Sequence, residues 1–170
     1  VEAAEKKRVE EENRRLEREL DLAREIQMGL VPAAPLDFLP WEVHGRVVPA
    51  RQVGGDYFDY FPLGEDRIAI TIADVSGKGV PAAILMSNLQ ATLRAFCDGV
   101  RPAAEIVRNV NQRMSLASSG GKFVTMFYAE IDRSTHRLRF VNAGHNFPYV
   151  RRPDGHLETP YLARAPDPQA

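Results

Sequence analysis

The first 28 residues contain neither glycine nor proline, and this stretch constrains the fold more than any other part of the chain. Ala, Glu, Arg, Lys and Leu dominate it, and all five are good helix formers. Residues 1–25 alone carry 16 charged side chains, of which 9 are acidic and 7 are basic. A helix this polar does not form a hydrophobic core by itself. The sequence therefore predicts a long solvated helix that stops at Gly29 and Pro32.

A heptad pattern runs along this predicted helix. The a positions hold Asn13, Leu20 and Gln27, and the d positions hold Val9, Leu16, Ala23 and Leu30. An Asn at an a position favours a parallel two-stranded register at some cost in stability. We therefore predict a homodimer through this helix, with Leu22, Ile26 and Met28 off the seam and packed on the domain that follows. The alternative is a single solvated helix that docks only at its C-terminal end.

Composition limits the kind of protein that the whole chain of 170 residues can be. Its 44% apolar residues suffice for a core, and its net charge of -1 argues against a general binder of nucleic acid or membrane surfaces. The single cysteine excludes an intramolecular disulfide framework and fits a reducing compartment. No stretch approaches the roughly 20 apolar residues that span a bilayer. We expect a cytoplasmic protein with a helical linker over 1–31 and one domain over 32–170.

Strand and helix patterns follow one another in blocks. Strands are predicted over 41–49, 56–61, 67–75, 123–131 and 137–142, helices over 81–96 and 103–116, and a hairpin over 147–152 and 156–159. Two consecutive helices between runs of strands favour antiparallel α+β layers over a doubly wound parallel sheet.

Two acidic loops at strand ends are candidate cation ligands. Asp56 follows Gly54-Gly55, and Asp74 precedes the loop Val75-Ser76-Gly77-Lys78-Gly79. Carboxylates beside glycines suit hard divalent cations, because glycines let backbone carbonyls and water join the coordination sphere. If the two strands pair, both carboxylates converge on one site; the alternative is two ordinary turns. Lys78 is a candidate phosphate contact, and a solvated lysine is the alternative.

Four segments in a fixed order resemble a known family. They are GGDYFDYF at 54–61, IADVSGKGVPAAILM at 72–86, KFVTMFYAEID at 122–132 and NAGHNFPYV at 142–150. They are similar to the metal-dependent type 2C (PPM) serine/threonine protein phosphatases, and closest to the bacterial SpoIIE/RsbU-like branch. LAREIQMGLVP at 22–32 resembles the helix that precedes this catalytic domain. The resemblance implies two packed antiparallel sheets flanked by helices.

The resemblance also implies metal-assisted hydrolysis. Two Mn²⁺ or Mg²⁺ ions would activate a bridging water that attacks phosphoserine or phosphothreonine in line. Asp74 would bridge both ions, the carbonyl of Val75 would complete one, and Asp56 would be a ligand directly or through water. Since no covalent intermediate is implied, we expect Cys97 to be a buried structural thiol.

Two further polar residues have open roles at this stage. His145 in the NAGH segment is either an acid or base or, as we favour, a hydrogen-bonded turn residue. Asp59 is a weaker site candidate that we expect to share a strand face with Asp56, with a surface ion pair as the alternative.

The resemblance further implies a substrate such as a phosphorylated anti-sigma-factor antagonist and an upstream sensor domain whose signal the helix relays. The family pattern continues past residue 160 with two more aspartate ligands. Asp154 lies at a predicted hairpin tip and Asp167 has no strand around it, so we expect the domain to be incomplete at its C-terminal end. The alternative function is a catalytically inactive regulatory and dimerisation module of the same fold.

Overall fold

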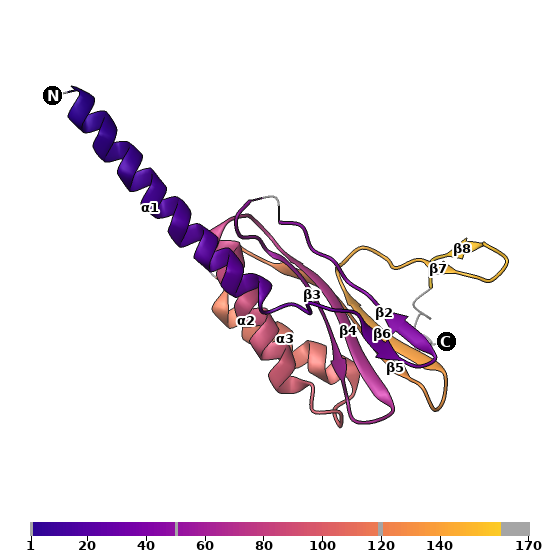
Figure 1. The fold of residues 1–170 in the computed structure, drawn as a ribbon. Coiled ribbons are helices and arrows are strands. Elements are labelled where there is room, and N and C mark those ends of the chain that lie inside the picture. Colours follow the sequence, from indigo (N-terminus) through magenta and orange to yellow (C-terminus); the bar gives the residue numbers. More distant parts are fainter. Residues whose placement is uncertain (1, 50, 119–120, 161–170) are drawn as a thin grey trace.

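The computed structural model describes residues 2–49, 51–118 and 121–160 (Figure 1). A long helix, α1 (Glu2–Met28), projects away from the rest of the molecule. The other elements in chain order are β1 (Leu36–Phe38), β2 (Trp41–Val43), β3 (Asp56–Pro62), β4 (Arg67–Val75), α2 (Val80–Phe96), α3 (Ala103–Ala117), β5 (Val124–Asp132), β6 (Arg137–Ala143), β7 (Val150–Arg151) and β8 (Leu157–Glu158).

The main sheet has four antiparallel strands in the order β3-β4-β5-β6. The two short pairs β1-β2 and β7-β8 are also antiparallel. Helices α2 and α3 lie together on one face of the main sheet (Figure 1). The predicted α+β class, with antiparallel strands and a long N-terminal helix, is therefore confirmed.

The face of the sheet under α2 and α3 holds the core, and we call it the helix-covered face. Strand side chains alternate between the two faces, so every second residue of each strand points toward the helices. Its buried apolar residues from strands and helices are Tyr57, Phe61, Ala69, Ala73, Val75, Met126, Tyr128, Ala82, Leu85, Met86, Leu89, Leu93, Ile106, Val107, Val110 and Met114.

The opposite face, which we call the open face, is also apolar but only partly covered. The segment after β2 crosses part of it, and a Cβ at Gly45 would lie 2.3 Å from the Phe58 ring, so only glycine fits there. The Tyr60 hydroxyl donates a hydrogen bond to the Ala34 carbonyl at 2.6 Å. Farther along this face, Ile72 is 48% exposed.

Two predicted strands are shorter in the structure. Only Trp41–Val43 of the predicted strand 41–49 is a strand, and it pairs with β1, which the sequence pattern did not predict. The remainder lies against the open face instead of forming a ladder. The hairpin after residue 147 is reduced to two paired residues in each strand, around a turn in which Gly155 has a φ of 86°.

The packing of α1 on the domain differs from the prediction. Leu22 and Ile26 are 58% and 63% exposed, so the prediction that they pack on the domain is wrong. Met28 does pack against the core, and Gln27 is the one buried residue of α1. A helix has 3.6 residues per turn, so Gln27, five positions after Leu22, lies on a different side of the helix from Leu22. In the described part of the chain, no helix has both the length and the hydrophobicity that a membrane crossing needs.

Candidate functional site

Strands β3 and β4 bring Asp56 and Asp74 directly opposite each other. The two residues are Cα partners in the antiparallel register, so they lie on the same face of the sheet. Directly opposed residues have Cβ atoms about 5 Å apart, and like charges in such a pair are destabilising. Both side chains are exposed, and among the described residues neither forms an ion pair. The pair therefore offers two unneutralised carboxylates to a cation.

A cavity of about 320 Å³ opens at this pair. Its walls come from four places in the chain: the end of α1, the loop before β3, the loop after β4, and Met86 on α2. The exposed cations Arg51 and Lys78 line it together with Asp56 and Asp74. Three of the predicted site residues thus line one cavity, and Arg51 was not predicted because no motif marks it.

The fourth predicted residue, Val75, ends β4 and is fully buried. Its N–H donates to the Gly55 carbonyl at 3.3 Å. A Cβ at Gly55 would lie 2.6 Å from the Val75 oxygen, so the two backbones approach as closely as they do only because residue 55 is glycine. The backbone of Val75 is therefore held against Gly55, the residue that precedes Asp56.

Gln27 also lines this cavity, although the heptad pattern predicted it in a dimer seam. Its Nε2 donates to the Gly54 carbonyl at 2.8 Å, and the Gly54 N–H donates to its Oε1 at 3.1 Å. Gln27 is polar, although it falls at a core position of the heptad. It also lies in the segment that resembles the helix before the catalytic domain. These two features could have indicated that Gln27 contacts the domain instead of a second helix.

His145 lies beside the same carboxylates. With Asp56 and Asp74 it lines a second cavity of about 230 Å³ on the open face. Its Nδ1 is 2.9 Å from the Thr125 hydroxyl, and its backbone N–H donates to the Asn142 side chain at 2.8 Å. The favoured interpretation, a hydrogen-bonded turn residue, agrees with these contacts.

Asp59 does not belong to this site, and the prediction that it shares a face with Asp56 is wrong. Three positions separate the two residues, so their side chains point to opposite faces. Asp59 is 0% exposed and accepts hydrogen bonds of 2.7 Å from Arg94 Nε, Arg94 Nη2 and the Tyr57 hydroxyl. Burial alone would lower the pKa of Arg94, but the hydrogen bonds and charge of Asp59 outweigh it and raise that pKa. Asp59 is a structural carboxylate.

Cys97, at the C-terminal end of α2, has the properties of a structural thiol. It is half-buried, and its Sγ lies 3.5 Å from the Tyr128 hydroxyl. Burial raises its pKa to about 11, so the thiol is neutral near pH 7. A neutral thiol on the helix-covered side is no nucleophile for a site on the opposite face.

The donors at the Asp56–Asp74 pair fit a hard divalent cation. Carboxylate and carbonyl oxygens are the ligands that Mg²⁺ and Mn²⁺ prefer, and Mg²⁺ is commonly held by one or two carboxylates with several waters. Over residues 2–49, 51–118 and 121–160, no three or more His, Cys, Asp or Glu side chains cluster as a metal centre. Asp154 accepts from the His156 N–H in the hairpin turn, as its predicted place at a tip requires. Asp167 lies outside the described residues.

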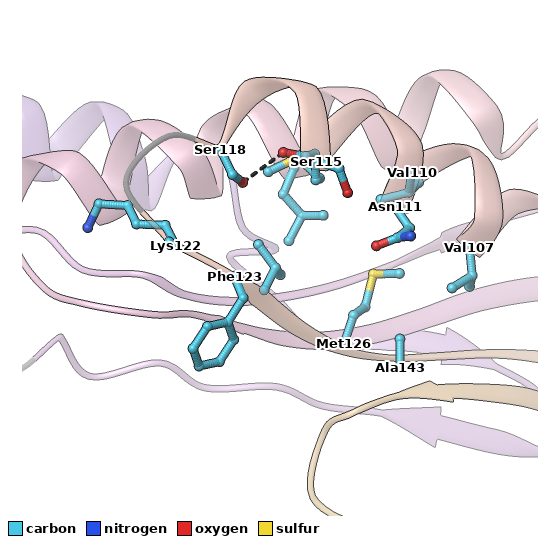
Figure 2. Close-up of a pocket in the computed structure, with 13 residues that line it drawn as sticks. Val107, Val110, Asn111, Ser115, Ser118, Lys122, Phe123, Met126 and Ala143 are labelled. Carbon is cyan, nitrogen blue, oxygen red and sulfur yellow. Dashed lines mark hydrogen bonds between the residues drawn. The ribbon is translucent and has the colours of Figure 1, made fainter.

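Another cavity of about 320 Å³ lies between α3 and strands β5 and β6 (Figure 2). Figure 2 shows Val107 and Val110 of α3 facing Met126 and Ala143, with Asn111, Ser115, Ser118 and Lys122 around them. Ser118 donates its hydroxyl to the Met114 carbonyl at 2.7 Å, so that polar group is already satisfied. Among the described residues that line this cavity, none is acidic.

Comparisons with known proteins show the family of this chain. The profile of the family described as Stage II sporulation protein E (SpoIIE) matches residues 64–167. Protein IcfG of Synechocystis is 32% identical over 164 residues, which cover 81% of this chain and 26% of that protein. Phosphoserine phosphatase RsbU of Bacillus subtilis is 31% identical over 128 residues, which cover 75% of this chain and 38% of that protein. The chain thus spans well under half the length of these curated relatives.

A solved structure shows the same fold. The RsbU and RsbW domains of Rv1364c from Mycobacterium tuberculosis superpose with a TM-score of 0.59 at 30% identity, covering 67% of this chain and 32% of that one.

Proposed function

We propose that this chain, which belongs to the SpoIIE family in the SpoIIE/RsbU-like branch of the type 2C (PPM) phosphatases, hydrolyses phosphoserine or phosphothreonine on a regulatory protein. The observation that carries the proposal is the Asp56–Asp74 pair, opposed in register at a cavity that also holds Arg51 and Lys78. Two carboxylates with two cations across a cavity suit a metal-bound phosphate ester. The likeness to a protein named as a phosphoserine phosphatase supports the reaction class.

The residues divide the work of this reaction. Mn²⁺ or Mg²⁺, when bound, would supply Lewis acidity and would lower the pKa of a coordinated water. Asp56 and Asp74 would hold the ions, and Val75 would contribute its carbonyl oxygen. Arg51 and Lys78 bind the phosphate, since guanidinium and ammonium groups form charge-assisted hydrogen bonds with its oxygens.

We propose a phosphorylated anti-sigma-factor antagonist as the substrate, the class that the family resemblance implies, acted on in the cytoplasm. The near-zero net charge of -1 supports recognition by shape and by the metal centre more than by overall charge. An upstream sensor domain would set the activity through α1.

We further propose that two copies associate through the N-terminal half of α1. Val9 and Leu16, both on the predicted heptad seam, are each 46% exposed, and Asn13 lies between them. The seam residues nearer the domain, Leu20 and Ala23, are partly covered. Sedimentation equilibrium at micromolar concentration measures this association, and a monomer mass there would contradict it.

The second candidate is an inactive regulatory module that binds a partner at the same cavity. The observation in its favour is that Asp56 and Asp74 are the only carboxylates that line this cavity in the described residues. Under this alternative the protein binds its phosphoprotein without releasing phosphate.

The experiment measures hydrolysis of p-nitrophenyl phosphate by the full-length protein with Mn²⁺. We expect Asp74→Ala to lower kcat/KM by about 100-fold or more, because a metal contributes several kcal/mol of transition-state stabilisation. Asp37→Ala, an exposed carboxylate on β1, is the matched control and should leave the rate unchanged. Unchanged activity in Asp74→Ala would overturn the assigned role, and an inactive wild type that still binds phosphoprotein would favour the regulatory module.

A further inference from the structure

Gln27 is a buried amide in a helix that is otherwise polar and exposed. Its side chain is 7% exposed, and it is the one buried residue of α1. Burying an amide costs free energy unless its donor and acceptor are both paired. Gln27 pairs both with one peptide unit: Nε2 donates to the Gly54 carbonyl at 2.8 Å, and Oε1 accepts from the Gly54 N–H at 3.1 Å. The burial is therefore compensated by a two-point contact with a single residue.

That residue lies two positions before a candidate metal ligand. Among the described residues, Gly54 makes no hydrogen bonds other than those with Gln27. Its neighbour Gly55 is packed from the other side, where an added Cβ would lie 2.6 Å from the Val75 oxygen and 3.3 Å from the Ala82 Cβ. The segment leading to Asp56 is thus held between α1 on one side and the end of β4 on the other.

Met86 closes the arrangement from α2. The Gln27 Nε2 lies 3.7 Å from the Met86 sulfur, and both residues line the Asp56–Asp74 cavity. Gln27 therefore contacts the loop that leads into Asp56 at the start of β3. It also contacts α2, the helix that follows β4, the strand that carries Asp74.

We propose that Gln27 is a positioning residue for the metal centre, which fixes the Gly54–Asp56 segment in the conformation that binds the cation. The proposal rests on the proposed function, and Gln27 acts through Gly54 without touching substrate or metal. Groups that orient metal ligands typically contribute 10-fold to 100-fold to metal affinity, so its loss should weaken Mn²⁺ binding by about 10-fold.

The test uses the full-length protein and three variants. Gln27→Met keeps the length and the apolar stem but loses both hydrogen bonds. Gln27→Asn keeps the amide one methylene short of Gly54, and it serves if the methionine variant does not fold. Gln112→Met, at an exposed position of α3 without a described hydrogen bond, is the matched control.

Two readouts separate a positioning role from a structural one. Calorimetric titration with MnCl₂ should give a dissociation constant about 10-fold higher for Gln27→Met and Gln27→Asn than for wild type and Gln112→Met. Hydrogen–deuterium exchange should be faster at residues 53–56 in both Gln27 variants, because the Gly54 amide loses its acceptor. Exchange across β4 and β5 should match wild type, which shows that the fold is intact.

Mn²⁺ affinity equal to wild type in a folded Gln27 variant would overturn the inference, as would unchanged exchange at Gly54. The failure of the proposed function has a different signature. If wild type itself binds no Mn²⁺, or if Asp74→Ala binds it as tightly, the metal assignment fails and the inference fails with it. If Asp74→Ala loses Mn²⁺ while Gln27→Met keeps it, only the inference fails.

Discussion

Asp56 and Asp59 stand three residues apart on β3 and have opposite surroundings. Asp59 is 0% exposed and accepts three hydrogen bonds of 2.7 Å from Arg94 and the Tyr57 hydroxyl. Asp56 is exposed, faces a second carboxylate across the ladder, and has no cationic partner among the described ion pairs. The fold itself supplies the hydrogen-bond partners of Asp59, whereas the carboxylate of Asp56 remains accessible to a ligand.

The two faces of the sheet extend this difference. On the helix-covered face, Tyr128 donates to Glu130 at 3.0 Å, and Glu130 in turn lies 3.5 Å from Arg67. No buried side-chain nitrogen or oxygen in the described ranges lacks a partner. The open face keeps its like-charged pair and part of its apolar surface exposed. Polar groups under the helices are therefore paired within the fold, whereas the two aspartates on the open face repel each other, and we propose that they bind a cation.

The largest expected effect comes from breaking the satisfied carboxylate. Arg94→Ala removes both guanidinium hydrogen bonds and the stacking of Arg94 over Phe61 at 3.9 Å, and leaves Asp59 buried without a cation. Breaking a buried pair costs 3–5 kcal/mol, and because Arg94 is 42% exposed we expect about 3 kcal/mol. Urea denaturation followed by circular dichroism measures the loss.

The control for this variant is Asp56→Asn on the same strand. It removes one of two facing charges, so the unfolding free energy should stay within about 0.5 kcal/mol of wild type or rise. If Asp56→Asn destabilised the protein as much as Arg94→Ala, the division into a structural and a binding carboxylate would be wrong.

The sequence identified Asp56 and Asp74 as residues that converge if their strands pair, and the register shows that they do. It did not predict the role of Asp59. Glycine-flanked acids at strand ends are local signals, and the strand patterns predicted β3 and β4 to within a residue or so. The partner of Asp59 lies 35 residues away on α2, and no local pattern encodes such a contact. The face of Asp59 does follow from the sequence: side chains alternate with a period of two, so a residue three positions after Asp56 points to the other face of the sheet.

The end of α1 illustrates the same limit. Helix-forming composition predicted the helix, and glycine and proline predicted its end at Gly29, because both signals are local. The side of α1 that contacts the domain involves a residue distant in sequence: Gln27 pairs with the N–H and the carbonyl of Gly54 in the loop before β3. With Gln27 paired to Gly54, Leu22 and Ile26 lie on the exposed side of the helix.

A second, smaller effect tests how well the helix-covered side shields the thiol of Cys97 from solvent. Burial raises the pKa of its thiol from 9.0 to about 11, so folding favours the neutral thiol. The associated stability is complete below pH 9 and is lost as the pH rises through about 11. At pH 8 the thiolate fraction should be about 100-fold lower than in the unfolded chain, and alkylation by iodoacetamide correspondingly slower.

The measurement is unambiguous because the chain has a single cysteine. The rate for the folded protein is compared with that in 6 M urea, and repeated from pH 8 to pH 11. Equal rates in both states at pH 8 would show that the thiol is as accessible and as acidic as in an unfolded chain, and the contrast between the two faces would not hold at the end of α2.

The smallest effect compares two isoleucines of β4 that share the open face. Ile68 is 0% exposed and Ile72 is 48% exposed, so deleting one methyl group should cost differently at the two positions. We expect about 1 kcal/mol for Ile68→Val and a few tenths for Ile72→Val, since only buried methyl groups leave a cavity. Urea denaturation of both variants gives the difference. If Ile72→Val costs as much as Ile68→Val, another layer covers Ile72 in solution, and the open face is a second core surface around the aspartate pair.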